Sequence, residues 1–168
     1  ESWGDVVVKQ YTRGGIFGRL IENRYWRWGH TRAEEEFAFI ENVRKLGVNA
    51  PKPLACIDQG WITYKAWLIT SLIPKAKSLA QISLEDEERA QRLMIELIRQ
   101  LSILIRNSIL HVDLHPGNVL VTENDDLFLI DFDRACNTDG SLNDLRDRYI
   151  FRWRRAVIKH QLPDLLSE

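Results

Sequence analysis

One polar cluster constrains the fold of this chain more than any other feature. The stretch 111–118 reads His-Val-Asp-Leu-His-Pro-Gly-Asn, and an Asp-Phe-Asp triplet begins at Asp131, thirteen residues after Asn118. Between them, two short apolar runs at 119–121 and 127–130 flank a turn-forming Glu-Asn-Asp-Asp. Apolar runs around such a turn predict a β-hairpin. Because a hairpin returns the chain to its starting point, we expect Asn118 and Asp131 to lie on the same side of one site.

The residue types in this cluster suit phosphoryl transfer. The reaction needs a carboxylate that orients an attacking hydroxyl and accepts its proton, and it needs oxygen ligands for the Mg²⁺ on a nucleoside triphosphate. Asp113 suits the first task. Asn118 and Asp131 suit the second, because they supply an amide oxygen and a carboxylate. We therefore predict that these three residues are catalytic, with ATP as the phosphate donor and Mg²⁺ held by Asn118 and Asp131.

A metal-hydrolase site is the alternative interpretation of the same stretch. His111 and His115 are four residues apart and Asp113 lies between them, a spacing that can share a metal ion when it falls on a helix. Pro116 and Gly117 follow directly, and both disfavour helical geometry. We therefore expect no helix here, which favours the phosphoryl-transfer interpretation.

The cluster resembles the catalytic loop His-x-Asp-Leu-x-x-x-Asn and the metal-binding Asp-Phe-Gly of the kinase superfamily. The loop matches completely, whereas Asp133 stands where protein kinases have glycine, which is more similar to small-molecule kinases of the same fold. The resemblance implies an α+β, protein-kinase-like fold with two lobes. It also implies that Lys9, at the end of a strand, and Glu36, on a helix, hold the α- and β-phosphates of ATP.

The glycine-rich loop that covers the phosphates in that superfamily is not visible ahead of Val6. The pair Gly14-Gly15 comes after the strand lysine, on the wrong side of it. We therefore expect an N-lobe that lacks its first strands and glycine-rich loop, and a reduced helical C-lobe. The only methionine is Met94, so we also expect the native chain to begin upstream of Glu1, with the phosphate-covering hairpin cut away, missing or replaced.

With 168 residues, 45% of them hydrophobic, the chain is expected to fold as a single kinase-like domain. Residues 1–72 are predicted as the N-lobe and hinge, with the adenine-binding hinge at 68–72, and residues 73–168 as the C-lobe. Apolar periods, caps and turn residues predict the other elements. These are a buried strand at 5–9, an irregular segment at 10–30, a helix from Thr31 to Gly47, one or two strands within 61–72, a helix from 85–88 to Asn107, and a helix over 142–159.

Further motifs narrow the resemblance within the superfamily. They are Lys-x-Tyr-x-Arg-Gly-Gly at 9–15, Arg-Tyr-Trp at 24–26, Glu-Phe at 36–37, Gly-x-x-x-Pro-x-Pro at 47–53 and Leu-Ile-Asp-Phe-Asp-Arg at 129–134. Together they resemble bacterial lipopolysaccharide-core kinases, which act on Kdo or on inner-core heptose. This resemblance implies transfer of the ATP γ-phosphate to a sugar hydroxyl of a lipid-anchored anionic glycan, at the cytoplasmic face of the inner membrane.

Local charge fits an anionic acceptor at a membrane, although the formal net charge is only −1. Residues 9–32 carry six basic side chains against Glu22, and residues 146–159 carry six against Asp147, interleaved with aromatic residues. Basic helices with aromatic side chains suit anionic membrane surfaces, whereas a solvated helix face is the plainer interpretation of any single arginine. The same patches suit RNA, but the near-neutral net charge makes nucleic acid the weaker partner.

The compartment follows from what the sequence does not contain. The longest apolar run falls far short of the ~18 residues that a membrane span needs, no secretory leader is visible, and Cys56 and Cys136 are too few for a disulfide framework. We therefore expect a cytoplasmic protein, peripheral to the inner membrane. Three functions stay open: a lipopolysaccharide-sugar kinase, another small-molecule or atypical Rio-like protein kinase of the same fold, and an inactive kinase-like binding module.

Overall fold

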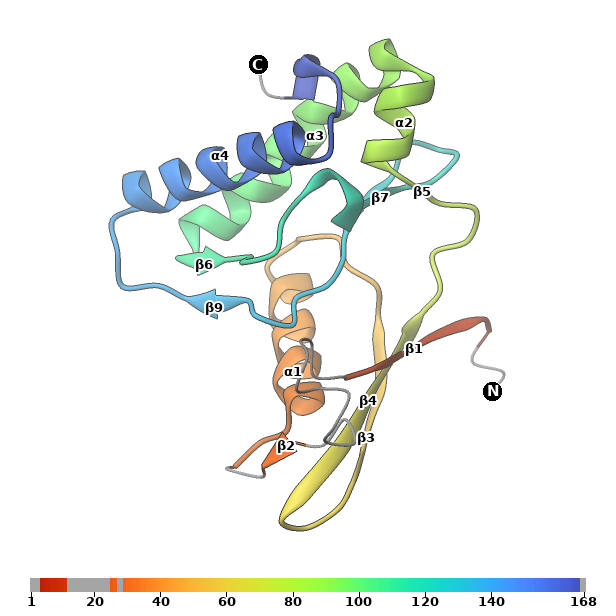
Figure 1. Cartoon of the computed structure of the whole chain (residues 1–168), viewed down its shortest axis with the longest axis vertical. Helices are drawn as coiled ribbons and strands as arrows, with labels where there is room; N and C mark the ends of the chain where they lie inside the picture. Colours follow the sequence, from red (N-terminus) through yellow and green to blue (C-terminus); the bar gives the residue numbers. More distant parts are fainter. Residues whose placement is uncertain (1–3, 12–24, 27–28, 167–168) are drawn as a thin grey trace. The chain divides into compact units, whose positions relative to one another are not determined.

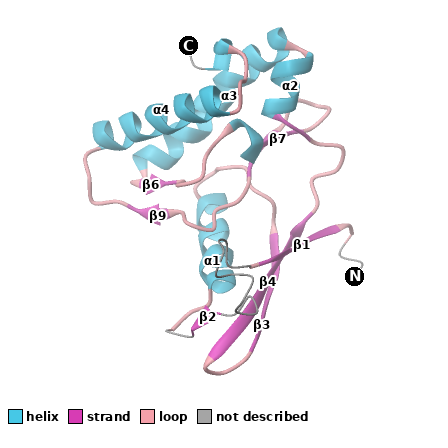
Figure 2. Cartoon of the chain, in the orientation of Figure 1, coloured by secondary structure: helices cyan, strands magenta, loops and turns pink. Residues whose placement is uncertain are grey.

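The computed structural model describes residues 4–11, 25–26 and 29–166, and these residues form two compact units. Unit 1 consists of the described residues up to Asn42 together with Pro51–Leu72, and unit 2 consists of Val43–Ala50 together with the described residues from Ile73 on. Unit 1 contains an antiparallel sheet, and unit 2 contains most of the helices (Figures 1 and 2). The predicted division into lobes and the predicted reduction of each lobe stay predictions.

Strand β4 (Thr63–Ser71) is the centre of the sheet in unit 1. It pairs antiparallel with β1 (Val6–Gln10) on one side and with β3 (Pro53–Gln59) on the other, and β2 (Tyr25–Trp26) pairs with its first residues. Every second residue from Tyr64 to Leu68 is buried, which is the period expected of a strand with one face in a core. The predicted strands in these regions are confirmed. The predicted irregular segment lies mostly outside the described residues.

The sequence predicts a buried strand at 5–9. The strand is present, but the prediction that it is buried is wrong. Val6, Val7 and Val8 of β1 leave 40%, 44% and 56% of their surface exposed. Among the described residues β1 pairs with β4 alone, so it is an edge strand of this sheet. A β-branched composition predicts a strand but does not distinguish a central strand from an edge strand.

The predicted adenine-binding hinge at 68–72 stays a prediction, and the boundary between the two units falls at its end, after Leu72. Residues 68–71 continue β4; all four pair with β1, and 68–70 also pair with β3. Only Leu72 lies beyond the strand. The apolar and β-branched residues of this region continue without a turn signal, so the end of the strand left no mark in the sequence.

Helix α1 (Arg32–Lys45) begins at the capping box that the sequence predicts. The Thr31 backbone nitrogen donates to Glu34 Oε2 (2.7 Å), and the Glu34 backbone nitrogen donates to Thr31 Oγ1 (3.3 Å). The helix ends just before Gly47, whose φ of 93° lies in the left-handed region that glycine adopts most easily. Both predicted ends of this helix are confirmed to within two residues.

The two long helices of unit 2, α3 (Glu87–Arg106) and α4 (Leu142–Lys159), confirm the predictions for those regions. Asp86 caps the start of α3 by accepting from the Arg89 backbone nitrogen (2.9 Å), and Ser141 caps α4. Each helix buries a stripe of mainly apolar side chains. Neither of them, nor any other helix in the described part of the chain, is long and apolar enough to cross a membrane.

Several short elements of unit 2 were not predicted. They are β5 (Lys77–Ser78), α2 (Leu79–Glu85), β6 (Ile109–Leu110), β9 (Cys136–Asn137) and the single-turn helix η3 (Asp164–Leu166). β5 pairs with β7 (Val119–Val121), and β6 pairs with β9. A two-residue strand has no period of its own, so its partner, far away in the sequence, decides whether it forms.

Candidate active site

The predicted hairpin is present in unit 2 and connects Asn118 to the segment of Asp131. Strand β7 (Val119–Val121) pairs antiparallel with β8 (Leu127–Leu129). One more backbone hydrogen bond extends this ladder, from the Ile130 nitrogen to the Asn118 carbonyl oxygen (3.0 Å). Asn118 and the residue directly before Asp131 are therefore neighbours at the open end of the predicted hairpin, and a site shared by the Asn118 and Asp131 side chains stays a prediction.

The Asn118 side chain is oriented by the loop that precedes it. It lies at the end of the single-turn helix η2 (Pro116–Asn118), and its amide nitrogen donates to the Asp113 backbone oxygen (2.9 Å). Because the amide nitrogen faces the loop, the amide oxygen is the atom available as a ligand. An amide oxygen and a carboxylate are ligand types that Mg²⁺ takes in proteins, so Asn118 and Asp131 fit this ion.

Among the residues that the structure describes, no larger metal centre competes with this pair. Within the described ranges, no group of three or more His, Cys, Asp or Glu side chains could hold a metal ion. Mg²⁺ in nucleotide sites is typically held by one or two protein side chains together with phosphates and waters. A two-ligand set is therefore the type expected for a nucleotide-bound Mg²⁺.

Asp131 has an unusual backbone conformation. Its φ is 65°, in the left-handed region that only a few per cent of non-glycine residues adopt, with aspartate among the more tolerant types. The next residue, Phe132, is 1% exposed and packs against the His111 ring, with 4.6 Å between the ring centroids. Such conformations persist where the surroundings fix them, and they cluster at functional sites. The buried Phe132, packed against His111, is part of these surroundings.

His111 joins the loop to the hairpin and is fully buried. Its Nε2 lies 2.9 Å from the Ile130 carbonyl oxygen, whereas its Nδ1 has no hydrogen-bond partner among the described residues. Because a carbonyl oxygen only accepts, Nε2 carries the proton. Burial lowers the pKa of His111, and the charges of Asp131 and Asp113 partly oppose this effect. Both carboxylates therefore lie within electrostatic reach of this one ring.

The helix that the metal-hydrolase alternative requires is not formed. Residues 112–113 make a turn, and His115 is extended, with φ −155° and ψ 164°. The expectation that no helix carries His111 and His115 together is confirmed, and Pro116 and Gly117 belong only to the single turn η2. His111 acts here as a buried support for the segment of Ile130.

The lowered pKa of His111 leads to a prediction about stability. When the pH falls below about 6.5, the unfolded chain binds a proton at this residue while the folded chain does not, so the free energy of unfolding falls with decreasing pH. Substitution of His111 by glutamine is expected to reduce this fall. The pKa of His115 is also lowered, mainly by burial, so part of the pH dependence remains. Chemical denaturation at several pH values measures the difference, and equal slopes for both proteins would contradict it.

His115 fixes the turn that carries Asn118. Its Nδ1 accepts a hydrogen bond from the Gly117 backbone nitrogen (3.1 Å) and so caps η2. On the other side, its ring packs near the ring of His160 at the end of α4, with 5.8 Å between the centroids. A Cβ atom at position 117 would lie 2.8 Å from His115 Cε1 and 3.0 Å from Nδ1. Glycine is therefore required for this capping arrangement.

We expect Gly117→Ala to displace the His115 ring and loosen the turn. A shift of about 1 Å in a catalytic group can cost about 10²-fold in rate, so kcat for phosphate transfer should fall about tenfold to a hundredfold. Gly140→Ala is the matched control, because a Cβ atom there meets nothing within 4 Å. Kinetics of both variants check the prediction, which is wrong if the two keep the same kcat.

Helix α4 holds the loop through two side chains that sequence reasoning missed. The Tyr149 hydroxyl accepts from the His111 backbone nitrogen (2.8 Å) and donates to the Ile109 carbonyl oxygen (3.0 Å), and burial raises its pKa, which keeps it protonated. Arg152 Nη1 donates to the Val112 carbonyl oxygen (2.8 Å). Arg152 is one of the six basic residues in 146–159, and this hydrogen bond shows that it also holds the loop. The only sequence signal for these contacts was the hydroxyl-bearing Tyr149 within the otherwise apolar stripe of α4.

In unit 1, Lys9 and Glu36 form an ion pair. Lys9 Nζ lies 2.8 Å from Glu36 Oε2 and 3.1 Å from Oε1, and the Glu36 side chain is 2% exposed. The Tyr11 hydroxyl donates to the same carboxylate, and Lys9 Nζ lies 5.1 Å from the centre of the Tyr11 ring. Of the three consecutive glutamates at 34–36, Glu36 is the buried one, and it directly precedes Phe37.

The structure thus assembles the predicted residues in two groups. Asp113, Asn118 and the segment of Asp131 are connected by hydrogen bonds in unit 2, and Lys9 is paired with Glu36 in unit 1. Their roles toward ATP and Mg²⁺ stay predictions.

Solved structures define the class of fold. The chain is similar to the bifunctional kinase-methyltransferase WbdD, with a TM-score of 0.53 and 23% identity over 88% of this chain and 32% of that one. It is also similar to the Cydia pomonella granulovirus kinase PK-1, with a TM-score of 0.52 and 16% identity over 70% of this chain and 43% of that one. The fold is therefore a mixed α+β fold of the protein-kinase type.

Sequence comparison identifies the family within that fold. The lipopolysaccharide kinase (Kdo/WaaP) family matches residues 2–155, and the chain belongs to this family. A 3-deoxy-D-manno-octulosonic acid kinase of Vibrio cholerae serotype O1 is 32% identical over 77% of this chain, and one of Vibrio parahaemolyticus serotype O3:K6 is 30% identical over 93%. The chain spans 56% of the length of the first relative and 67% of the second.

Proposed function

We propose that this protein is an ATP-dependent kinase that phosphorylates a hydroxyl of 3-deoxy-D-manno-octulosonic acid (Kdo) in a lipopolysaccharide precursor. Membership of the Kdo/WaaP family and the names of the two Vibrio relatives support this acceptor over inner-core heptose and over a protein. The observation that carries the proposal is the hydrogen-bonded connection of the Asp113 loop, through Asn118, to the segment of Asp131.

Asp113 is the general base in this proposal. Its side chain is exposed, and its backbone oxygen holds the amide of Asn118. The carboxylate accepts the proton of the sugar hydroxyl while that oxygen bonds to the γ-phosphorus and the bond to the bridging oxygen of ADP breaks. The products are the phosphorylated sugar, ADP and the proton on Asp113, which is then released to water.

The other site residues orient the nucleotide. Asn118 and Asp131 would hold Mg²⁺, which neutralises charge on the triphosphate when bound. Lys9, held by the buried carboxylate of Glu36, supplies a cation for the α- and β-phosphates. In this proposal residues 1–72 form the small lobe and residues 73–168 the helical lobe of one kinase domain. The acceptor is lipid-anchored, so the protein works at the cytoplasmic face of the inner membrane.

Label transfer from γ-³²P-ATP tests the proposal directly. The acceptors are a Kdo-bearing lipid A precursor, the same precursor without Kdo, and a general protein substrate. Label is expected on the first acceptor alone. Transfer to protein would favour the atypical protein kinase alternative, and no transfer to any acceptor by protein that is folded would favour the inactive binding module.

A further inference from the structure

Helix α4 carries a second apolar stripe besides the one that faces the core. Leu145, Tyr149, Trp153 and Val157 are buried, as expected for an amphipathic helix. On the outward side, however, Ile150, Phe151 and Ile158 expose 43%, 67% and 75% of their surface. The solvent side of a surface helix is ordinarily polar, so this face is unusual.

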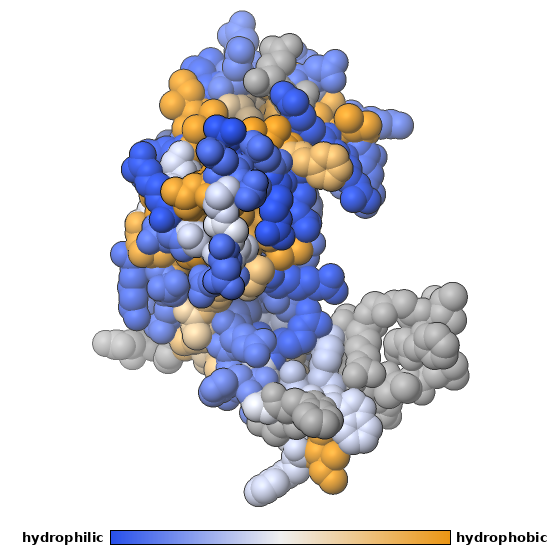
Figure 3. Space-filling view, turned by 90° about the vertical axis from the view of Figure 1, so that its left-hand side faces the viewer, coloured by the Kyte–Doolittle hydropathy of each residue, from blue (hydrophilic) through white to orange (hydrophobic). Residues whose placement is uncertain are grey.

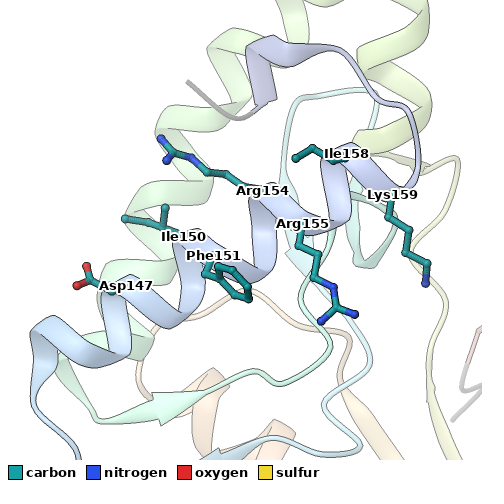
Figure 4. A pocket seen from close by; sticks show the side chains of 7 residues that line it. All are labelled: Asp147, Ile150, Phe151, Arg154, Arg155, Ile158 and Lys159. Atoms are coloured by element: carbon teal, nitrogen blue, oxygen red, sulfur yellow. The ribbon is translucent and has the colours of Figure 1, made fainter.

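Cationic side chains accompany these apolar ones. In Figure 4 the labelled residues project from successive turns of α4 in two adjacent rows of spacing four. The α4 face, as we name it, consists of Ile150, Phe151, Arg154, Arg155, Ile158 and Lys159. Asp147 also lines this surface, and its carboxylate is paired with Arg146 at 3.1 Å. Figure 3 shows that hydrophobic patches on the surface of unit 2 are bordered by strongly hydrophilic surface.

We propose that the α4 face binds the surface of an anionic lipid bilayer; this rests on the proposed function in so far as the acceptor is lipid-anchored. A helix that combines exposed Phe and Ile with Arg and Lys lies at the headgroup level, its apolar side chains between the lipids and its cations among the anionic headgroups. Arg155 and Lys159 supply the charge complementarity, and the three exposed apolar side chains supply the insertion.

A second exposed apolar site is the alternative candidate for membrane binding. Trp61 and Ile62, in the turn between β3 and β4, are 94% and 73% exposed. Their nearest charged neighbours in the sequence are Asp58 and Lys65, whose charges cancel. The nearest charges along the chain therefore give this turn no net positive charge, whereas cations lie within the α4 face itself, which makes the α4 face the better match for an anionic membrane.

Vesicle sedimentation of the full-length protein, without ATP or acceptor, tests the inference. Wild type is expected to bind vesicles that contain phosphatidylglycerol, to bind pure phosphatidylcholine weakly, and to dissociate as the salt concentration rises. The double substitution Phe151→Ser and Ile158→Ser, and separately Arg155→Glu, should each lower the partition coefficient about tenfold or more. Trp61→Ser with Ile62→Ser is the matched control and should bind as wild type does.

Two further arms separate this inference from the proposed function. Asp113→Ala should bind vesicles as wild type does, and the α4-face variants should keep wild-type activity on detergent-dispersed acceptor. Unchanged vesicle binding by the α4-face variants, or loss of binding only in the Trp61 control, overturns the inference. It is also overturned if wild type prefers RNA to vesicles, or if the substitutions dissociate a dimer, which would make the face an interface between copies.

Discussion

Asp113→Ala is expected to lower kcat for phosphate transfer by about 10²–10⁴-fold, the range that a general base contributes. The side chain is exposed, so its loss should change the free energy of unfolding little. The hydrogen bond to Asn118 uses the Asp113 backbone oxygen, which alanine keeps. The turn that carries Asn118 is therefore expected to survive in the variant, and a loss of activity reports the carboxylate itself.

The control for this variant is Asp139→Ala. Asp139 is an exposed aspartate of unit 2, so its removal changes the net charge by the same amount at a distant position in the sequence. Steady-state kinetics with saturating ATP should show wild-type kcat for Asp139→Ala. Equal turnover by Asp113→Ala and wild type would exclude Asp113 as the base.

Glu36→Ala is expected to lower both stability and activity. The Glu36 carboxylate accepts from Lys9 and from the buried Tyr11 hydroxyl, and substitution removes both interactions at once. Removal of one partner of a buried hydrogen bond costs about 1–3 kcal/mol, and the free energy of unfolding should fall by about this amount. Lys9 would also lose the carboxylate that orients it.

The effect on catalysis follows from the role of Lys9. A charge-assisted hydrogen bond contributes about 1.5–3 kcal/mol, so loss of the oriented lysine should lower kcat/KM for ATP about tenfold to a hundredfold. Glu35→Ala is the matched control, since Glu35 precedes Glu36 on the same helix and is exposed. Denaturation curves and ATP titrations of both variants decide the matter. The account of the ion pair is wrong if both alanines behave alike.

The hairpin of β7 and β8 and the long helices were predictable because their signals are local. Two apolar runs around a polar turn specify a hairpin, and a capping box followed by an apolar stripe specifies α1. The choice of Lys9 and Glu36 as partners was implied by family resemblance, and their ion pair is present in the structure.

What the sequence did not reveal depends on contacts between distant residues. The edge position of β1 depends on which strands pair with it, and the end of β4 at Ser71 depends on partners on both sides. The bonds of Tyr149 and Arg152 to the loop join residues about forty positions apart. His115 caps η2 through a side chain that the sequence offered only as a possible metal ligand.

Metal-dependent binding of ATP tests the central claim most directly. Isothermal titration of ATP into the protein, with and without Mg²⁺, should show that binding is much tighter with the ion, and Asn118→Ala and Asp131→Asn should each remove most of this difference. Asp113→Ala should keep the metal dependence of wild type. The account would be contradicted if wild type bound ATP equally well with and without Mg²⁺. It would also be contradicted if Asn118→Ala and Asp131→Asn both kept the full metal dependence of wild type.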